Sequence, residues 1–380
     1  MSRVRDDIGQ LLWIGYSGPV SPALRGRLAR GEAGATILFK RNLPIAEVAG
    51  PDGAPHELCD LDALIALTGE LHVRAPDGTP ALIAVDQEGG AVQRVRAPAT
   101  RWPAMAALDR FAAPEDTELA EAVGRAIGDE LAALGFDIDF APVLDVHTNP
   151  ANPIIGDRAF GGDPEAVARR GLAFARGLDA AGMIGCGKHF PGHGDTATDS
   201  HLELPRIDHA WDRLERVELL PFRRAAEAGL PMIMTAHVVF AALDPTRPAT
   251  LSPEVMTGLL RDRLGYRGVI VSDDLDMRAI ADHIGAGPAA VGAVRAGCDV
   301  VLLCRDEDHQ AQAEAALIRE AEGDAELRRR IGESAARVRA LKQAHAAARA
   351  RRPPAARASI GSAEHRRLAD LVGAPFRVTP

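Results

Sequence analysis

Eight short runs of apolar and β-branched residues recur along the chain, separated by longer stretches with helical periodicity. The runs span residues 11–15, 35–39, 81–85, 137–144, 183–187, 232–236, 268–272 and 299–303. Strands that are apolar on both faces belong to parallel sheets covered by helices, so eight such units predict an α/β protein with a closed (β/α)8 TIM barrel. An open doubly wound sheet is the alternative, but no GxGxxG sequence follows the first run.

The stretches between the runs carry signals of helix formation. Leu119, Val123, Ile127 and Leu131 form one apolar stripe on a helix expected from about residue 114 to residue 134. Elsewhere a residue with a capping side chain precedes a proline, which favours a helix start because proline suits the first helical position. These pairs are Ser21-Pro22, Asp163-Pro164 and Ser252-Pro253.

The length of 380 residues would allow two or three domains, but the runs occupy most of it, so we expect a single domain. Residues 1–348 are predicted to form the barrel, with an outer helix over 324–348 at its C-terminal end. Residues 349–380 are predicted to form a C-terminal tail, whose basic segment 349–358 is a solvated connector. Residues 45–60 are typical of an insertion on a barrel loop.

Charge and composition narrow the classes of partner. The net charge of -9 argues against general binding to nucleic acid or to an anionic membrane. The chain has four widely spaced cysteines and no CxxC pair, which is typical of reduced thiols in a cytosolic protein. We find neither a signal peptide nor an apolar stretch long enough to span a bilayer. We therefore expect a cytoplasmic protein.

Ionisable side chains stand at the ends of five runs. They are Asp86, Asp145, Lys188 with His189, His237, and Asp273 with Asp274. Barrel enzymes carry their chemistry at the C-terminal ends of the strands, where such residues converge on one pocket. Any one of them could be a helix cap or a salt-bridged surface residue, but five together predict an active site.

The segment from residue 188 to residue 201 is the densest in such residues. His189, His193 and His201 could ligate a metal, but the spacing matches neither HxH at a strand end nor HExxH on a helix. Proton transfer is the other interpretation. Asp199 could orient His201 by accepting a hydrogen bond from its ring, which would give an acid and base near neutral pH.

Such a proton donor needs a reaction partner. Asp273, at the end of the seventh run, is a carboxylate that could attack carbon and form a covalent intermediate. Asp274 follows it directly, and spacing alone does not separate the two.

At this point the motifs become recognisable as a set. They are VDQEGGAVQR (85–94), DFAPVLDV (139–146), NPIIGDRAFG (152–161), KHFPGHGDTATDSH (188–201), TAH (235–237) and VIVSDDLDM (269–277). In this order they resemble glycoside hydrolase family 3, and within it the bacterial β-N-acetylglucosaminidases of peptidoglycan recycling. The resemblance extends from about residue 10 to residue 305 and accounts for every predicted strand end.

The resemblance implies a role for each candidate residue. Asp273, rather than Asp274, would be the nucleophile, and His201 supported by Asp199 would be the acid/base on a loop that moves inward when substrate binds. The terminal N-acetylglucosamine would be held through its hydroxyls, with His237 and Asp145 lining the same pocket. The residues implied to hold it are Asp86, Arg94, Arg158, Lys188 and His189.

The implied activity is that of a retaining exo-β-N-acetylglucosaminidase, a monomer without cofactor or metal, acting on muropeptides. Related β-glucosidases and β-xylosidases lack the Asp-Ser-His motif and take their acid/base from a second domain. The roughly 75 residues after the last run are too few for that domain. The open alternatives are a phosphorylase of the same family, a metal-dependent hydrolase on the same barrel, and a sugar-binding protein without catalysis.

Two features depart from the expected pattern. His147 follows Asp145-Val146 where asparagine would be more usual, and the insertion 45–60 lengthens one barrel loop. If either lies near the leaving group, it affects the choice of leaving group and leaves the core sugar site unchanged.

Overall fold

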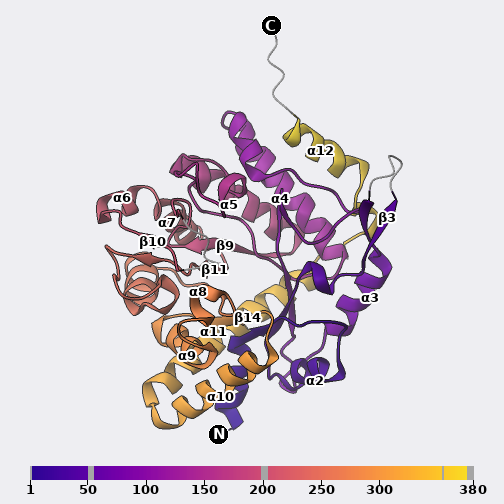
Figure 1. Cartoon of the computed structure of the whole chain (residues 1–380). Coiled ribbons are helices and arrows are strands. Elements are labelled where there is room, and N and C mark those ends of the chain that lie inside the picture. The colour runs from indigo at the N-terminus through magenta and orange to yellow at the C-terminus, as the bar shows by residue number, and fades with distance from the viewer. Residues whose placement is uncertain (1, 50–54, 198–203, 353–354, 375–380) are drawn as a thin grey trace.

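A computed structural model describes residues 2–49, 55–197, 204–352 and 355–374. Eight strands close into a parallel barrel in the order β1-β2-β5-β8-β9-β11-β13-β14, and β14 pairs back with β1 (Figure 1). Their bounds are β1 Leu12–Ile14, β2 Ala35–Leu38, β5 Leu82–Val85, β8 Ile138–Asp139, β9 Ile184–Phe190, β11 Met232–Thr235, β13 Val269–Asp274 and β14 Val300–Leu303. Each strand begins in one of the eight predicted runs, and β9 and β13 extend beyond theirs to Phe190 and Asp274, so the predicted (β/α)8 barrel is confirmed.

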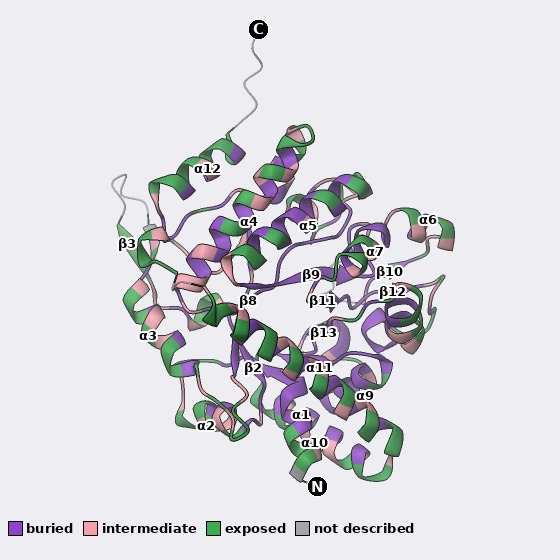
Figure 2. Ribbon diagram, turned by 180° about the vertical axis from the view of Figure 1, so that it is seen from behind, coloured by how far each residue is buried: buried purple, intermediate pink, exposed green. Residues whose placement is uncertain are grey.

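Helices surround this barrel, and the strands inside them are buried (Figure 2). Helix α1 (Ser2–Leu11) precedes β1, and six helices follow strands in the first two thirds of the fold: α2 Pro22–Arg30, α3 Leu61–Leu71, α4 Glu115–Ala133, α5 Pro164–Ala181, α6 Trp211–Arg216 and α7 Leu220–Glu227. The remainder carries η5 Glu254–Arg263, α8 Arg278–Ala281, α9 Ala286–Ala296, α10 Glu307–Gly323, α11 Ala325–Ala350 and α12 Ala363–Gly373. Helix α4 confirms the stripe predicted between residues 114 and 134.

Two of the three expected helix starts follow the capping rule. The side chain of Ser21 accepts a hydrogen bond from the Leu24 amide, and that of Asp163 accepts one from the Ala166 amide. The third differs only in the helix that follows, because η5 (Glu254–Arg263) has π-type hydrogen bonding, and Pro253 directly before it already has helical backbone angles. Ser252 still accepts a bond of 3.3 Å from the Val255 amide, so its hydroxyl caps this turn as expected.

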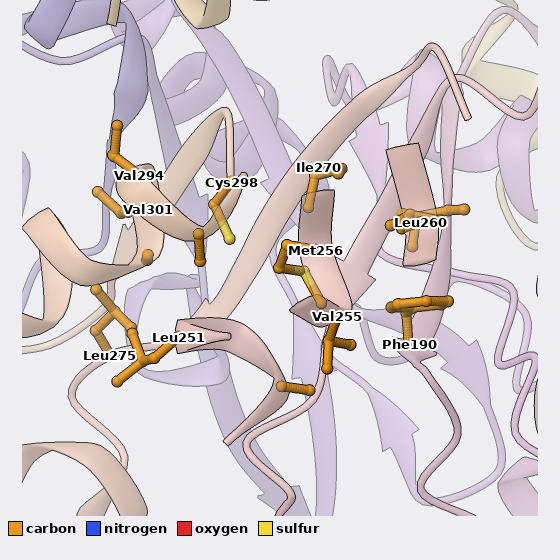
Figure 3. Packing of buried hydrophobic residues seen from close by; sticks show 14 of the residues in the cluster. Phe190, Leu251, Val255, Met256, Leu260, Ile270, Leu275, Val294, Cys298 and Val301 are labelled. Carbon is orange, nitrogen blue, oxygen red and sulfur yellow. The ribbon is translucent and has the colours of Figure 1, made fainter. Parts of the chain in front are cut away.

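The apolar core has an inner and an outer part. Inside the barrel, side chains such as Trp13, Phe140 and Met234 fill the space between strands. Between strands and helices, Ile270 of β13 packs in one cluster with Met256 of η5 and other side chains (Figure 3). All four cysteines are buried and free, which agrees with the expectation of reduced thiols.

Segments outside the strand and helix alternation also have structure of their own, among them the insertion and the C-terminal segment. The insertion contains an antiparallel hairpin of β3 (Ile45–Ala49) and β4 (Pro55–Cys59), which leaves the barrel after the C-terminal end of β2. After α11, the segment expected as a tail contains α12, in which Ala369 and Val372 are buried in the same cluster as Trp102. None of the helices in the described part of the chain is long and apolar enough to cross a membrane.

Candidate active site

A cavity of about 490 Å³ opens at the C-terminal ends of the barrel strands. Six of the predicted site residues line it: Asp86, Arg94, Arg158, Lys188, His189 and Asp273. Asp145 and His237 are fully buried and contact residues of the cavity wall. Asp199 and His201 lie outside the described residues.

One wall of the cavity is a cluster of alternating charges that we call the ionic cluster, formed by Asp86, Glu88, Arg94, Arg158 and Lys188. The Lys188 ammonium lies 2.9 Å from Asp86 and 2.5 Å from Glu88. Arg94 contacts the other oxygen of Asp86 at 3.2 Å. These contacts lower the pKa of Asp86 and raise the pKa of Lys188 despite burial, so both groups are charged.

Glu88 was not among the predicted site residues. Its carboxylate accepts two hydrogen bonds of 2.8 Å from Arg158, and the side chain is almost fully buried. Burial opposes its ionisation, but the charges of Arg158 and Lys188 outweigh burial and lower its pKa to about 2. The sequence feature that could have indicated Glu88 is its position two residues after the strand-end Asp86. In the structure it lies on a short hairpin of β6 (Gln87–Gly89) and β7 (Val92–Gln93).

A second arrangement fixes His189. Its Nδ1 lies 2.7 Å from the carboxylate of Asp145, which also accepts hydrogen bonds from the backbone amides of His189 and His193. Burial opposes ionisation of Asp145, but these partners hold its pKa below the ordinary value. The carboxylate therefore orients the imidazole and leaves Nε2 as the ring nitrogen for a ligand.

The two aspartates at the end of β13 have different surroundings. One Asp274 oxygen accepts hydrogen bonds of 3.0 Å from the backbone amides of Asp276 and Cys304. Burial, and then the charge of Asp276, raises the pKa of Asp274 to about 7. The Asp273 carboxylate instead accepts a bond of 2.8 Å from the Asp274 amide. Asp274 therefore ties the end of β13 to the end of β14.

His237 supports the same region from behind. Its Nδ1 lies 2.8 Å from the hydroxyl of Thr250, and its Nε2 lies 3.0 Å from the backbone carbonyl of Asp274. Thr250 also contacts the Thr235 hydroxyl at 2.7 Å, and that hydroxyl accepts a bond from the Asp273 amide. This chain of contacts fixes the backbone that carries Asp273.

The loop after β9 leaves the cavity wall at His193, whose burial lowers its pKa to about 4 and keeps its ring neutral. Asp195 anchors the next turn through the Thr148 hydroxyl at 2.7 Å and through His209. Gly194 lies so close to Val146 that an added Cβ would be 1.8 Å from its carbonyl oxygen. This packing fixes the start of the loop that leads to residues 198–203.

Another part of the cavity edge carries four cations that we call the basic rim, namely Lys40, Arg41, Arg278 and Arg305. Arg41 donates to the carbonyls of Tyr16 and Cys304. Burial, together with the nearby charges of Arg305 and Arg94, lowers the pKa of Arg41. Lys40 pairs with Glu57 of β4, which places the insertion hairpin beside this edge.

Of the three histidines considered as metal ligands, His189 and His193 are described and His201 lies outside the described residues. No group of three or more His, Cys, Asp or Glu side chains within it is arranged to hold a metal ion. His189 uses Nδ1 for Asp145, and the Nδ1 of His193 lies 2.8 Å from the hydroxyl of Thr196.

Charged side chains gathered in one cavity at the C-terminal ends of the strands are typical of enzymes built on a (β/α)8 barrel. Residues 3–341 match the glycosyl hydrolase family 3 N terminal domain, and the chain belongs to this family. The predicted family is thereby confirmed.

Several relatives agree with this assignment. A β-hexosaminidase of Alkalilimnicola ehrlichii is 45% identical over 304 residues, covering 77% of this chain and 80% of the relative. The structure of a family 3 β-N-acetylglucosaminidase from Paenibacillus is 40% identical with a TM-score of 0.85, covering 97% of this chain and 68% of the other. The structure of NagZ from Neisseria gonorrhoeae is 32% identical with a TM-score of 0.76, covering 97% and 98% of the two chains. The chain is therefore a glycoside hydrolase of the β-hexosaminidase type.

Proposed function

We propose that the protein is a retaining exo-β-N-acetylglucosaminidase that removes terminal N-acetylglucosamine from peptidoglycan fragments. The observation that carries the proposal is the position of Asp273 on the wall of one cavity with the ionic cluster. A buried set of fixed charges suits the several hydroxyls of a terminal sugar, because each hydroxyl both donates and accepts hydrogen bonds. The carboxylates of the cluster accept bonds from those hydroxyls, and its cations donate to them.

Asp273 is the proposed nucleophile. Its carboxylate attacks C1 of the sugar and forms a glycosyl-aspartate while the bond from C1 to the leaving oxygen breaks. Asp274 is unsuited to this role, because its carboxyl is bonded to two backbone amides and its raised pKa leaves it partly protonated near neutral pH. The contacts that fix the Asp273 backbone hold the nucleophile in place for this attack.

His201, supported by Asp199, is the proposed acid/base. It protonates the leaving oxygen in the first step, and in the second it takes a proton from the water that attacks C1 and releases Asp273. Two displacements at C1 retain the β configuration. The chain that leads toward these two residues is anchored at Asp195, which accepts a hydrogen bond from the Thr148 hydroxyl.

The basic rim supports a leaving group that carries carboxylates, as peptidoglycan fragments do. Four cations line the cavity here although the protein as a whole has a net charge of -9, and two of them, Lys40 and Arg278, are also paired with Glu57 and Asp282. Arg305 is exposed, and its charge lies near that of Arg41. Like charges held together at a cavity edge favour an anionic ligand.

The test is hydrolysis of 4-nitrophenyl N-acetyl-β-glucosaminide by the wild type and by Asp273→Ala, Asp274→Ala and His201→Ala. We expect Asp273→Ala to lose at least about a thousandfold in kcat, because the covalent step disappears. Asp274→Ala should retain measurable turnover. Wild-type turnover in Asp273→Ala together with an inactive Asp274→Ala would overturn the nucleophile assignment.

The remaining candidate activities are separated with the same substrate. Release of N-acetylglucosamine 1-phosphate in phosphate buffer would identify a phosphorylase. Loss of activity after dialysis against EDTA would identify a metal-dependent hydrolase. Binding of N-acetylglucosamine by the wild type without release of nitrophenol would identify a sugar-binding protein.

A further inference from the structure

Helix α12 lies on the outside of the barrel beside α4, beyond the residues that match the family 3 domain (Figure 1). Its inner face is apolar where it meets the core, with Val372 fully buried, and Leu371 on its other side is half exposed. His365, in its first turns, is buried and reaches further inward. Helix α12 is far along the chain from the active-site motifs, but contacts of His365 lead from it toward the cavity.

The partner of His365 is the buried carboxylate of Glu130 on α4. His365 Nδ1 lies 2.9 Å from Glu130 Oε1, and the Gly361 amide donates to the same oxygen at 3.0 Å. Thr100 donates to the two oxygens through its hydroxyl at 2.5 Å and its amide at 3.0 Å. Glu130 thus joins the start of α12 to the segment around Thr100.

The same segment continues to Trp102, whose ring centroid lies 6.1 Å from that of His365. The Trp102 amide donates to the side chain of Gln93 at 3.0 Å, and the Gln93 amide group donates back to the Trp102 carbonyl at 2.8 Å. The Gly90 amide donates to that carbonyl as well. Strand β7, through Gln93, and the turn between β6 and β7, through Gly90, are therefore both bonded to Trp102.

This hairpin carries part of the ionic cluster. Glu88 lies on β6, and Arg94 directly follows β7, where the Gln87 side chain accepts a 2.9 Å bond from the Arg94 amide. The hairpin also rests against the segment at Pro103, because a Cβ added at Gly89 would lie 2.5 Å from the Pro103 carbonyl oxygen. A shift of the Trp102 segment would consequently move Glu88 and Arg94.

We infer that α12 is a positioning element of the sugar site, acting through His365, Glu130, Trp102 and Gln93 on the hairpin that bears Glu88 and Arg94. The inference rests on the sugar-binding role proposed above for the ionic cluster. It assigns a role in substrate affinity to a segment outside the matched domain. His365 touches no substrate, so its effect is on the placement of the hairpin.

The test is the variant His365→Ala, with His345→Ala as the matched control. His345 is equally buried, and its Nε2 lies 3.1 Å from a buried carboxylate, that of Asp137. Asp137 precedes β8, so this pair lies at the end of the barrel opposite the cavity. Both variants remove an imidazole from a buried carboxylate, and only one of them bears on the hairpin.

For His365→Ala we expect the KM for 4-nitrophenyl N-acetyl-β-glucosaminide and the Kd for N-acetylglucosamine to rise about tenfold, with kcat within about twofold of wild type. Both variants should lower the melting temperature to a similar extent. His345→Ala should leave KM and Kd unchanged. His365→Asn should restore KM, because the asparagine amide can donate to Glu130 from the position of Nδ1. If His365→Ala does not fold, Glu130→Gln keeps the side-chain shape and should raise KM in the same direction.

Equal KM and Kd in His365→Ala and His345→Ala, with the wild type active, would overturn this inference alone. A rise in KM for His365→Ala that His365→Asn fails to reduce would also count against it. A wild type that neither hydrolyses the substrate nor binds N-acetylglucosamine would overturn the proposed function and the inference with it.

Discussion

Glu88 and Arg158 are joined by two parallel hydrogen bonds of 2.8 Å across the wall of the cavity, although 70 residues of sequence separate them. The carboxylate also approaches Lys188, so one acidic side chain holds two cations of the ionic cluster. Bidentate pairs of this kind fix the plane of the guanidinium as well as its distance. The position of Arg158 in the site thus depends on Glu88.

Glu88→Ala should therefore impair both affinity and stability. Its removal leaves the charges of Arg158 and Lys188 partly uncompensated in a buried place, which costs about 3 kcal/mol of folding free energy. We expect kcat/KM on 4-nitrophenyl N-acetyl-β-glucosaminide to fall at least about a hundredfold. Glu57→Ala, which removes a more exposed partner of Lys40, is the control and should change neither the melting temperature nor kcat/KM appreciably.

Asp145→Asn should raise KM and leave the fold intact. The substitution keeps the shape of the side chain and removes the charge that His189 Nδ1 and two backbone amides now face. We expect a rise in KM of about tenfold or more, because the imidazole loses its fixed orientation. Titration of N-acetylglucosamine by calorimetry checks this, and an unchanged Kd would contradict the role of Asp145 in orienting His189.

Asp274 should make stability depend on pH. Its pKa is about 7 in the folded protein and lies near 4 in an unfolded chain, so the folded state binds more protons between these values. Its contribution therefore reduces stability as pH rises from about 4 to about 7 and changes no further above that range. In Asp274→Asn the difference in unfolding free energy between pH 5 and pH 8 should shift in favour of pH 8 relative to wild type.

Arg305→Ala should distinguish the leaving group from the sugar. Arg305 belongs to the basic rim and not to the ionic cluster, so KM for the uncharged nitrophenyl glycoside should stay at the wild-type value. For an N-acetylglucosaminyl substrate whose leaving group carries carboxylates, KM should rise about three- to tenfold at low salt, and added salt should reduce the difference. Arg319→Ala, an exposed arginine on α10, is the control.

Much of the site could be predicted because the ends of barrel strands converge. Asp86, Lys188, His189 and Asp273 each follow an apolar run, and closure of the barrel brings all four to one cavity. Glu88 was missed because its importance comes from its partners, Lys188 on β9 and Arg158 in the short helix Gly156–Arg158, which lie far from it in the sequence. The buried positions of Asp145 and His237 behind the wall depend on packing depth, which spacing along the chain does not report.

Helix α12 illustrates the same limit. The basic, proline-bearing segment 349–358 precedes it and was expected to be a solvated connector, and residues 349–380 as a whole were expected to form a tail. The buried contacts of His365 with Glu130 and of Val372 with the Trp102 cluster depend on surfaces that exist only once α4 has packed on the barrel. A short amphipathic segment is helical in a protein chiefly because such a surface is available to it.

The sequence by itself determined the eight strands, the helices between them and the ends at which charged residues stand, because periodicity and capping are local properties of the chain. The tertiary structure decided which charges are paired, which aspartate at the end of β13 is tied to backbone amides, and which distant segment supports the hairpin of Glu88. Those outcomes depend on distances between residues far apart in sequence, and the closed barrel sets these distances.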